Sequence, residues 1–189
     1  MNSAAHNARH RISWLCGLLL TVCLNSVQAQ AVRTDVPLHI RNEIPEAVLQ
    51  GSGSYRWFGL RIYDASLWTE PQGWQGNNPH FALDLTYARS LYGRKIAEAS
   101  LTEIEKLKFG STEQHQRWLQ QMNALFPDVN EGSRITGIYH AGNSARFYLN
   151  GKWLGEIKDP EFAKAFFAIW LDPRTSAPRL REQLILQTR

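Results

Sequence analysis

Arginines that lie within stretches of aromatic and branched residues are the first candidates for chemistry in this sequence. Four residues have this setting, namely Arg56, Arg61, Arg89 and Arg146. An arginine at the mouth of an apolar pocket binds a carboxylate well, because its planar guanidinium donates two parallel hydrogen bonds to the two oxygens. For any single arginine, the simpler interpretation is that its stem lies along an apolar surface with the charged head in water. The four together predict that at least one faces a cleft.

Tyrosines in the same stretches are candidates for a second hydrogen bond to such an anion. They are Tyr55, Tyr63, Tyr87 and Tyr148. Packing in the core or against a neighbouring strand is the alternative for each of them, and it is the better supported role for any single tyrosine here. The pattern therefore allows an anion site without locating it.

Other kinds of chemistry have weaker support. Gly51 and Gly53 precede a β-favouring run instead of a helix, so they do not form a phosphate-binding loop. No Gly-x-Ser-x-Gly motif of a serine hydrolase is present. The histidines after position 30 are widely spaced, which favours surface and turn positions over a metal site, although ligands from distant strands stay possible. These histidines are His39, His80, His115 and His140.

The first 29 residues have the layout of a secretory signal peptide. Arg9 and Arg11 precede an apolar run at residues 12–24, and Ala29 is a small residue before a cut at position 30. A cut after Ala31 fits almost as well. The run is shorter than the roughly 20 residues of a membrane span, which disfavours an uncleaved anchor, and a valine before Cys23 disfavours a lipoprotein. We expect a domain at residues 30–189 that is periplasmic or secreted.

Removal of this leader changes the charge and the cysteine content. The whole chain has 21 basic and 17 acidic residues. Cleavage removes Arg9 and Arg11 and no acidic residue, so the mature chain has a formal charge of +2. Without a basic run, nucleic-acid binding is poorly supported. Both cysteines, Cys16 and Cys23, also leave. Disulfides and thiolate chemistry are therefore excluded from the mature chain.

The hydrophobic pattern predicts a single α+β domain. Strands are expected at residues 36–41, 47–57, 60–70, 80–89, 133–140 and 145–157, with tight turns at Phe58-Gly59 and Asn150-Gly151. Helices are expected at residues 91–109, from Ser111 or Thr112 to Pro127, from the Asp159 cap to Pro173, and at 178–186 after a Ser176 cap. The order predicts an antiparallel sheet with its helices gathered on one side.

Several stretches together resemble the chalcone isomerase-like family, in particular its exported bacterial branch. They are LQGSGSYRWFGLRIYDASLWTE, ALDLTYARSLYGRKIAEASLTEIEKL, LFPDVNEGSRITGIY, RFYLNGKWLGEI and DPEFAKAFFAIWLDPRTSAPRLREQLI. The resemblance covers nearly the whole chain after the leader. It implies an open-faced sandwich, in which a large antiparallel sheet packs against a layer of helices with a ligand cleft between them.

The resemblance also implies two alternative activities, since some members cyclise chalcones and others bind fatty acids without catalysis. Arg56 matches the arginine of the family enzymes, allowing one residue of slippage. Their first threonine falls near Tyr63, and their second falls at or beside Phe167. Their water-ordering tyrosine has no counterpart, because this chain has Phe109, Gly110 and Ser111 there. The resemblance thus favours binding over isomerisation, since ring closure needs those hydroxyl groups.

The sequence therefore predicts an exported, non-catalytic protein that binds a fatty-acid-like or other apolar anion, without cofactor or metal. Arg56 is the first candidate for the carboxylate partner, and Arg89, Tyr87 and Tyr63 are the further candidate ligand-binding residues. An isomerase or intramolecular lyase is one alternative, and an envelope interaction module without a small ligand is another. The natural ligand and the oligomeric state stay open.

Overall fold

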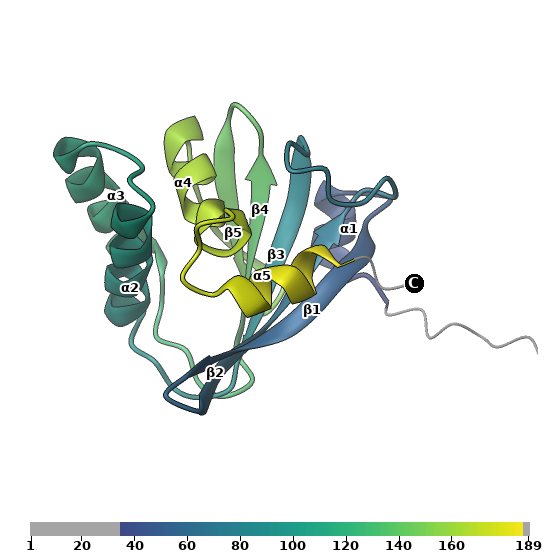
Figure 1. The fold of residues 1–189 in the computed structure, drawn as a ribbon, viewed down its shortest axis with the longest axis horizontal. Coiled ribbons are helices and arrows are strands. Elements are labelled where there is room, and N and C mark those ends of the chain that lie inside the picture. Colours follow the sequence, from purple (N-terminus) through teal and green to yellow (C-terminus); the bar gives the residue numbers. More distant parts are fainter. Residues whose placement is uncertain (1–34, 187–189) are drawn as a thin grey trace, which may run out of the picture. The chain divides into compact units, whose positions relative to one another are not determined.

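A six-stranded antiparallel sheet forms the framework of residues 35–186, the part of the chain that this computed structural model describes (Figure 1). Each strand pairs with the next one along the chain, in the order β1-β2-β3-β4-β5-β6. The elements in chain order are α1 (Leu38–Glu43), β1 (Val48–Trp57), β2 (Leu60–Thr69), β3 (His80–Tyr87), α2 (Gly93–Lys106), α3 (Thr112–Leu125), β4 (Arg134–His140), β5 (Ser144–Leu149), β6 (Lys152–Ile157), α4 (Pro160–Leu171) and α5 (Pro178–Ile185). The predicted α+β class and antiparallel sheet are confirmed.

Two tight turns set the register of the outer hairpins. Phe58 and Gly59 connect β1 to β2 with φ of 46° and 79°, and Asn150 and Gly151 connect β5 to β6 with φ of 51° and 80°. Two successive residues with positive φ are typical of the type I′ turn, whose twist matches that of the flanking strands. Both turns were predicted at these positions and are confirmed.

The main core lies between one face of the sheet and helices α2 to α5. Helix α4 supplies more of its buried rings than any other described element does, and Phe162, Phe166 and Trp170 are among them. Asp159 caps this helix as predicted: one carboxylate oxygen accepts from the backbone N–H groups of Glu161 and Phe162, at 3.0 and 3.1 Å. Its other oxygen accepts from the buried indole of Trp118 at 2.8 Å. One aspartate thus joins the start of α4 to α3.

The connection between β3 and β4 carries the helix pair α2 and α3. Ser111 caps α3 in a reciprocal capping box, in which Gln114 also accepts from the Ser111 backbone N–H. The expectation of a Ser176 cap for α5 is wrong. Ala177 precedes that helix without a side-chain cap, and the Ser176 hydroxyl donates instead to Glu103 of α2.

The opposite face of the sheet carries the short helix α1, where the sequence predicted an edge strand. The prediction failed because Val36, Leu38 and Ile40 alternate like a strand, although the buried pair in the structure is Ile40 and Ile44, one helical turn apart. These two isoleucines pack on a second core that includes Trp68 of β2. The helices therefore lie on both faces of the sheet, whereas the sequence predicted all of them on one side.

Polar contacts also hold α1 to the sheet. His39 bonds Thr136 of β4 at 2.8 Å, and the Thr136 hydroxyl donates to the buried carboxylate of Asp84 at 2.6 Å. Glu43 accepts from Arg146 of β5 at 2.8 Å and from the Tyr148 hydroxyl. Arg146 and Tyr148, two of the aromatic-flanked residues of the sequence, therefore serve the attachment of α1.

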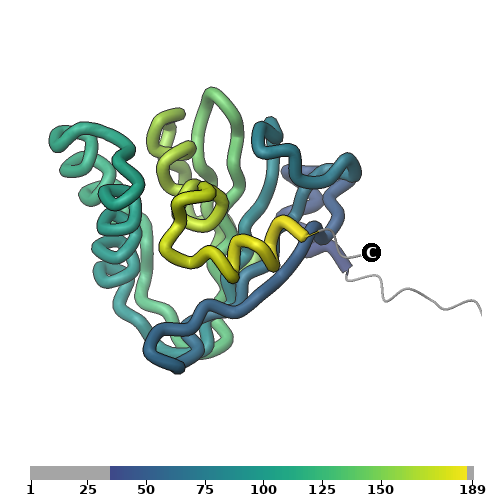
Figure 2. Tube along the Cα trace, in the orientation of Figure 1, coloured from purple at the N-terminus to yellow at the C-terminus, as the bar shows by residue number. Residues whose placement is uncertain are grey.

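Gly51 and Gly53 let α5 cross directly over strand β1 (Figure 2). A side chain at Gly51 would overlap the main-chain carbonyls of Gln183 and Leu184, and one at Gly53 would overlap the Gln183 side chain. The neighbouring Gln50 donates to the carbonyl of Ile185 at 2.9 Å. The glycines are thus a helix-packing site inside a strand.

The predicted signal peptide at residues 1–29 lies outside the described residues. Within residues 35–186, no helix is both long and apolar enough to span a bilayer.

Candidate functional site

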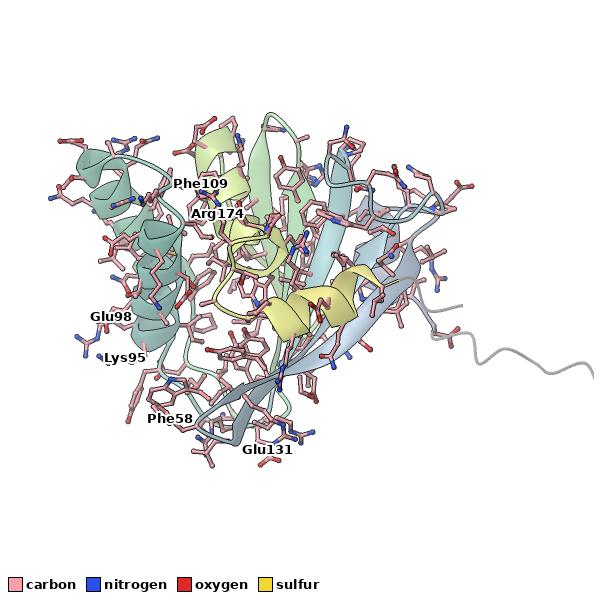
Figure 3. All side chains as sticks on the ribbon, viewed as in Figure 1. Phe58, Lys95, Glu98, Phe109, Glu131 and Arg174 are labelled. Atoms are coloured by element: carbon pink, nitrogen blue, oxygen red, sulfur yellow. The ribbon has the colours of Figure 1, made fainter. Side chains whose placement is uncertain are left out.

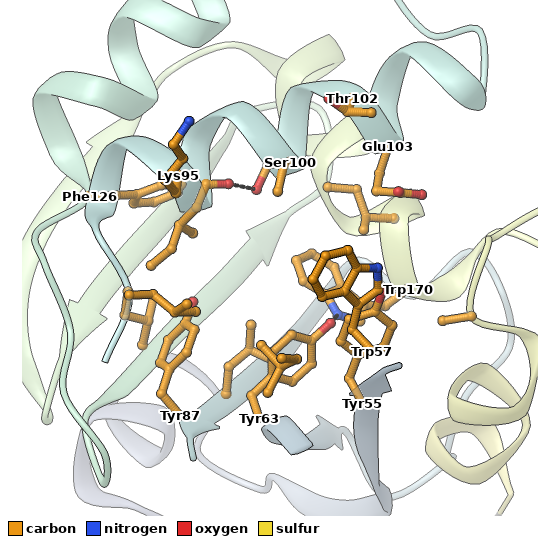
Figure 4. Close-up of a pocket in the computed structure, with 18 of the residues that line it drawn as sticks. Tyr55, Trp57, Tyr63, Tyr87, Lys95, Ser100, Thr102, Glu103, Phe126 and Trp170 are labelled. Atoms are coloured by element: carbon orange, nitrogen blue, oxygen red, sulfur yellow. Dashed lines mark hydrogen bonds between the residues drawn. The ribbon is translucent and has the colours of Figure 1, made fainter. Parts of the chain in front are cut away.

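A cavity of about 600 Å³ lies between strands β1 to β3 and helices α2 and α4 (Figure 4). Most of its wall is apolar, and its volume falls within the roughly 300–1,000 Å³ of ligand pockets. Its lining residues are Tyr55, Trp57, Ile62, Tyr63, Leu85, Tyr87, Leu91, Lys95, Ile96, Ala99, Ser100, Thr102, Glu103, Phe126, Ile135, Phe166, Ile169, Trp170, Ser176 and Ala177.

Three tyrosines from three adjacent strands form the sheet side of the cavity. Tyr55 of β1 pairs directly with Tyr63 of β2, and Tyr63 pairs directly with Tyr87 of β3. The first two rings stack with centroids 5.1 Å apart, and the second pair meets edge to face at 6.1 Å. We call this set the tyrosine row. Figure 4 shows the three side chains rising from the strands toward α2.

The hydroxyl groups of the tyrosine row can donate hydrogen bonds into the cavity. The Tyr63 oxygen accepts from the indole N–H of Trp170 at 2.9 Å, which leaves its own proton free for another partner. The Tyr87 hydroxyl has no hydrogen-bond partner among residues 35–186. Burial raises the pKa of both phenols well above the ordinary value. Both phenols are therefore neutral near pH 7, and each keeps a proton that it can donate.

Helix α2 forms the opposite wall with residues spaced three or four apart. Ile96, Ala99 and Ser100 face the cavity, and the Ser100 hydroxyl donates back to the Ile96 carbonyl at 2.8 Å. Two charged residues lie on the rim. The Lys95 ammonium is 2.7 Å from Glu98, and Glu103 is 2.7 Å from the Lys106 ammonium.

Both rim charges are paired along the helix, and the other polar residues of the lining, which are Tyr, Trp, Ser and Thr, carry no charge. The part of the chain that the structure describes contains no grouping of three His, Cys, Asp or Glu side chains suited to a metal ion. The lining of this cavity offers apolar surface and neutral hydrogen-bond groups.

The four residues predicted to bind a ligand divide into two pairs. Tyr63 and Tyr87 line the cavity, whereas Arg56 and Arg89 do not. Arg56 is exposed on β1 and donates to the carbonyl of Gly59 at 3.2 Å. Arg89 follows the end of β3 and is half-buried. The structure thus brings the two phenols together and places the two arginines outside the cavity wall.

Trp57 and Trp170 were missed as cavity residues. Trp57 is two residues from Tyr55 on the same strand, so strand alternation puts the two on one face and was the signal that could have found it. Trp170 was expected only as a core residue of its helix, and its bond to Tyr63 joins elements far apart in the sequence. No local signal indicates that contact.

Phe167, at or beside the place of a family threonine, packs instead against Phe81 and Tyr139, with ring centroids 5.1 and 5.6 Å away. It does not line the main cavity. The ring fills space above β3 and β4 and offers no hydroxyl to a substrate.

Comparisons with known proteins agree with this fold. A curated protein of Haemophilus influenzae, described as uncharacterised, is 30% identical over 139 residues, which are 74% of this chain and 68% of the relative. The crystal structure of a fatty-acid binding protein of Arabidopsis thaliana superposes with a TM-score of 0.60 at 16% identity, covering 74% of this chain and 87% of that chain. That likeness shows a shared fold. The pattern described as chalcone isomerase-like matches residues 27–185, and the chain belongs to the chalcone isomerase-like family.

Proposed function

We propose that this protein is exported to the periplasm or beyond, and that its cavity binds a fatty acid or a similar amphipathic molecule without converting it. The observation that carries the proposal is the tyrosine row on the wall of an apolar cavity of about 600 Å³. A leader with the layout of a signal peptide supports export. The structural neighbour from Arabidopsis, itself a fatty-acid binding protein, supports the ligand class.

Apolar burial supplies the affinity in this proposal. Each methylene transferred from water contributes about 0.8 kcal/mol, so about ten methylenes contribute roughly 8 kcal/mol before the cost of ordering the chain. The rings of Phe126, Phe166 and Trp170 and the side chains of α2 surround such a chain. An acyl chain fits this lining better than a polar metabolite does.

The head group is recognised by hydrogen bonds from neutral phenols. Tyr63 and Tyr87 keep their protons because burial raises their pKa, so each can donate to a carboxyl oxygen. The same donors serve an ester or a ketone, so the class is an apolar chain that ends in a hydrogen-bond acceptor. Non-catalytic binding is supported by the pairing of Lys95 and Glu103, the two charged residues of the lining, with their neighbours on α2.

The test is retention of saturated fatty acids of 8 to 18 carbons by the chain from residue 30 onward, measured by native mass spectrometry and by thermal melting. Ala99→Trp fills the cavity from α2 and is expected to lower retention at least about tenfold. Ala124→Trp is the matched control, because Ala124 is exposed on α3 and outside the lining.

The absorbance of a chalcone is expected to stay unchanged with the protein present. Absence of any retained fatty acid, or equal retention by the two tryptophan variants, would overturn the assignment of the cavity. Turnover of the chalcone would overturn non-catalytic binding alone.

A further inference from the structure

The tip of the β1–β2 hairpin, residues 56–61, exposes large apolar side chains beside the cavity. Phe58 is 87% exposed, Trp57 59% and Leu60 50%. The two rings meet edge to face at 4.8 Å, so they form one apolar surface. Trp57 also lines the cavity, as does Lys95 of α2. Figure 3 shows Phe58 at the edge of the molecule, on the same side of the view as Lys95.

Phe58 is an unfavourable residue for this turn. Its φ of 46° lies in the left-handed region, where a bulky side chain is uncommon. The other two-residue turn of the sheet has Asn150 at the equivalent position, with nearly the same φ of 51°. Asparagine and glycine are the usual choices there. An exposed phenylalanine at such a backbone position packs only on the neighbouring Trp57 among the ring contacts of the described residues, which favours a role in an interaction.

Arginines flank this apolar tip on both strands. Arg56 has no carboxylate partner within residues 35–186, and its guanidinium donates only to the carbonyl of Gly59. Arg61 is half exposed and lies 3.4 Å from Asp64, a weak pair at the surface. Exposed rings between arginines are complementary to a phospholipid surface, because rings insert at the level of the head groups while guanidinium groups pair with phosphates.

We propose that the hairpin tip docks the protein on a phospholipid bilayer, so that the cavity exchanges its ligand with the membrane. The first part stands on the tip alone, and the exchange of ligand rests on the proposed function. Trp57 connects the two, because the same ring belongs to the docking surface and to the cavity wall. A poorly soluble acyl chain can then pass between bilayer and cavity without crossing water.

The chain from residue 30 onward tests the docking, since the described residues 35–186 belong to one compact unit. Co-sedimentation with vesicles of phosphatidylethanolamine and phosphatidylglycerol is compared with co-sedimentation with phosphatidylcholine vesicles. The wild type is expected to bind both, and the anionic vesicles at least about fivefold more tightly. Phe58→Asn is expected to lower binding at least about tenfold with an unchanged or higher melting temperature, because asparagine suits the turn.

Two further variants complete the test. Arg56→Gln combined with Arg61→Gln is expected to remove the preference for anionic vesicles and its salt dependence. Trp153→Ser is the control, since Trp153 is 55% exposed on β6 and is expected to leave binding unchanged. Failure of the wild type to bind either vesicle, or undiminished binding by Phe58→Asn, overturns the docking, and a protein partner at the tip would give the first result.

The two proposals fail separately. Loss of fatty-acid retention with intact vesicle binding would overturn the proposed function and leave the docking surface in place. Retention without vesicle binding would overturn the docking alone. Ala99→Trp is expected to bind vesicles like the wild type, because Ala99 lies on the wall of the cavity and outside the hairpin tip.

Discussion

Removing one hydroxyl from each of two neighbouring tyrosines is expected to affect stability very differently. Tyr63 and Tyr87 are cross-strand partners in the same wall, yet only the Tyr63 oxygen accepts a hydrogen bond, from Trp170 at 2.9 Å. Tyr63→Phe leaves the N–H of a 6% exposed indole without an acceptor. An unsatisfied buried donor costs about 1–3 kcal/mol, which is the expected loss in the free energy of unfolding.

Tyr87→Phe is expected to change the free energy of unfolding of the ligand-free protein by less than about 0.5 kcal/mol, because its hydroxyl has no partner to lose among residues 35–186. Its effect appears with ligand. A hydrogen bond to a charged carboxylate is worth about 1.5–3 kcal/mol, so the affinity for a fatty acid falls by roughly tenfold or more.

Urea unfolding followed by circular dichroism measures the two stabilities, and displacement of a fluorescent fatty acid measures the affinities. Tyr92→Phe is the matched control, since Tyr92 is 71% exposed and outside the cavity wall. Equal losses of stability in Tyr63→Phe and Tyr87→Phe would refute the reasoning, because they would show that the indole contact carries no special weight. Unchanged affinity in Tyr87→Phe would refute its role as a donor to the ligand.

Two further outcomes follow from the second core and from helix α4. Burial lowers the pKa of His39, so the unfolded chain takes up more protons as the pH falls. The free energy of unfolding of the wild type relative to His39→Gln should therefore fall from pH 7.5 to pH 5.5, by at most about 1.4 kcal/mol. Urea unfolding at both pH values measures this difference, and an increase toward pH 5.5 would contradict the expectation. Asp159→Ala removes a helix cap and the acceptor of the buried Trp118 indole, so it should cost about 2–4 kcal/mol, and a loss below about 1 kcal/mol in the same assay would show that neither contact matters.

Local signals were enough to predict most of the fold. The turn at Asn150-Gly151 and the cap at Asp159 depend on neighbouring residues alone, and both are present as expected. Helix α1 depends on tertiary contact instead. Its six residues bury Ile40 against the far face of the sheet, and a helix of that length has little stability of its own. Alternating apolar residues therefore indicated a strand.

The cavity wall shows where prediction of the site stops. From the turn at Phe58-Gly59, a regular hairpin would pair Tyr55 with Ile62, but the register shifts by one residue and Tyr55 meets Tyr63. This irregularity turns Tyr63 to the same face as Tyr55, and a one-residue shift exchanges the faces of every residue beyond it. Arg56 lies outside the wall for a different reason, because it alternates along β1 with Tyr55 and Trp57, which both line the cavity. The shift has no marker in the sequence, so the tyrosine row could not be derived from it.

The cavity is too large to be a closed void in a stable fold. A closed void of about 600 Å³ would cost roughly 14 kcal/mol at about 24 cal/mol per Å³, as much as the whole stability of a typical domain. The fold tolerates this volume because the cavity opens to solvent beside the exposed Trp57 and Lys95. Water makes few hydrogen bonds against such walls, and an acyl chain that replaces it makes the apolar contacts the walls lack. Under the proposed function and docking, the tyrosine row would fix one end of that chain, and the neighbouring hairpin tip would meet the bilayer that supplies it.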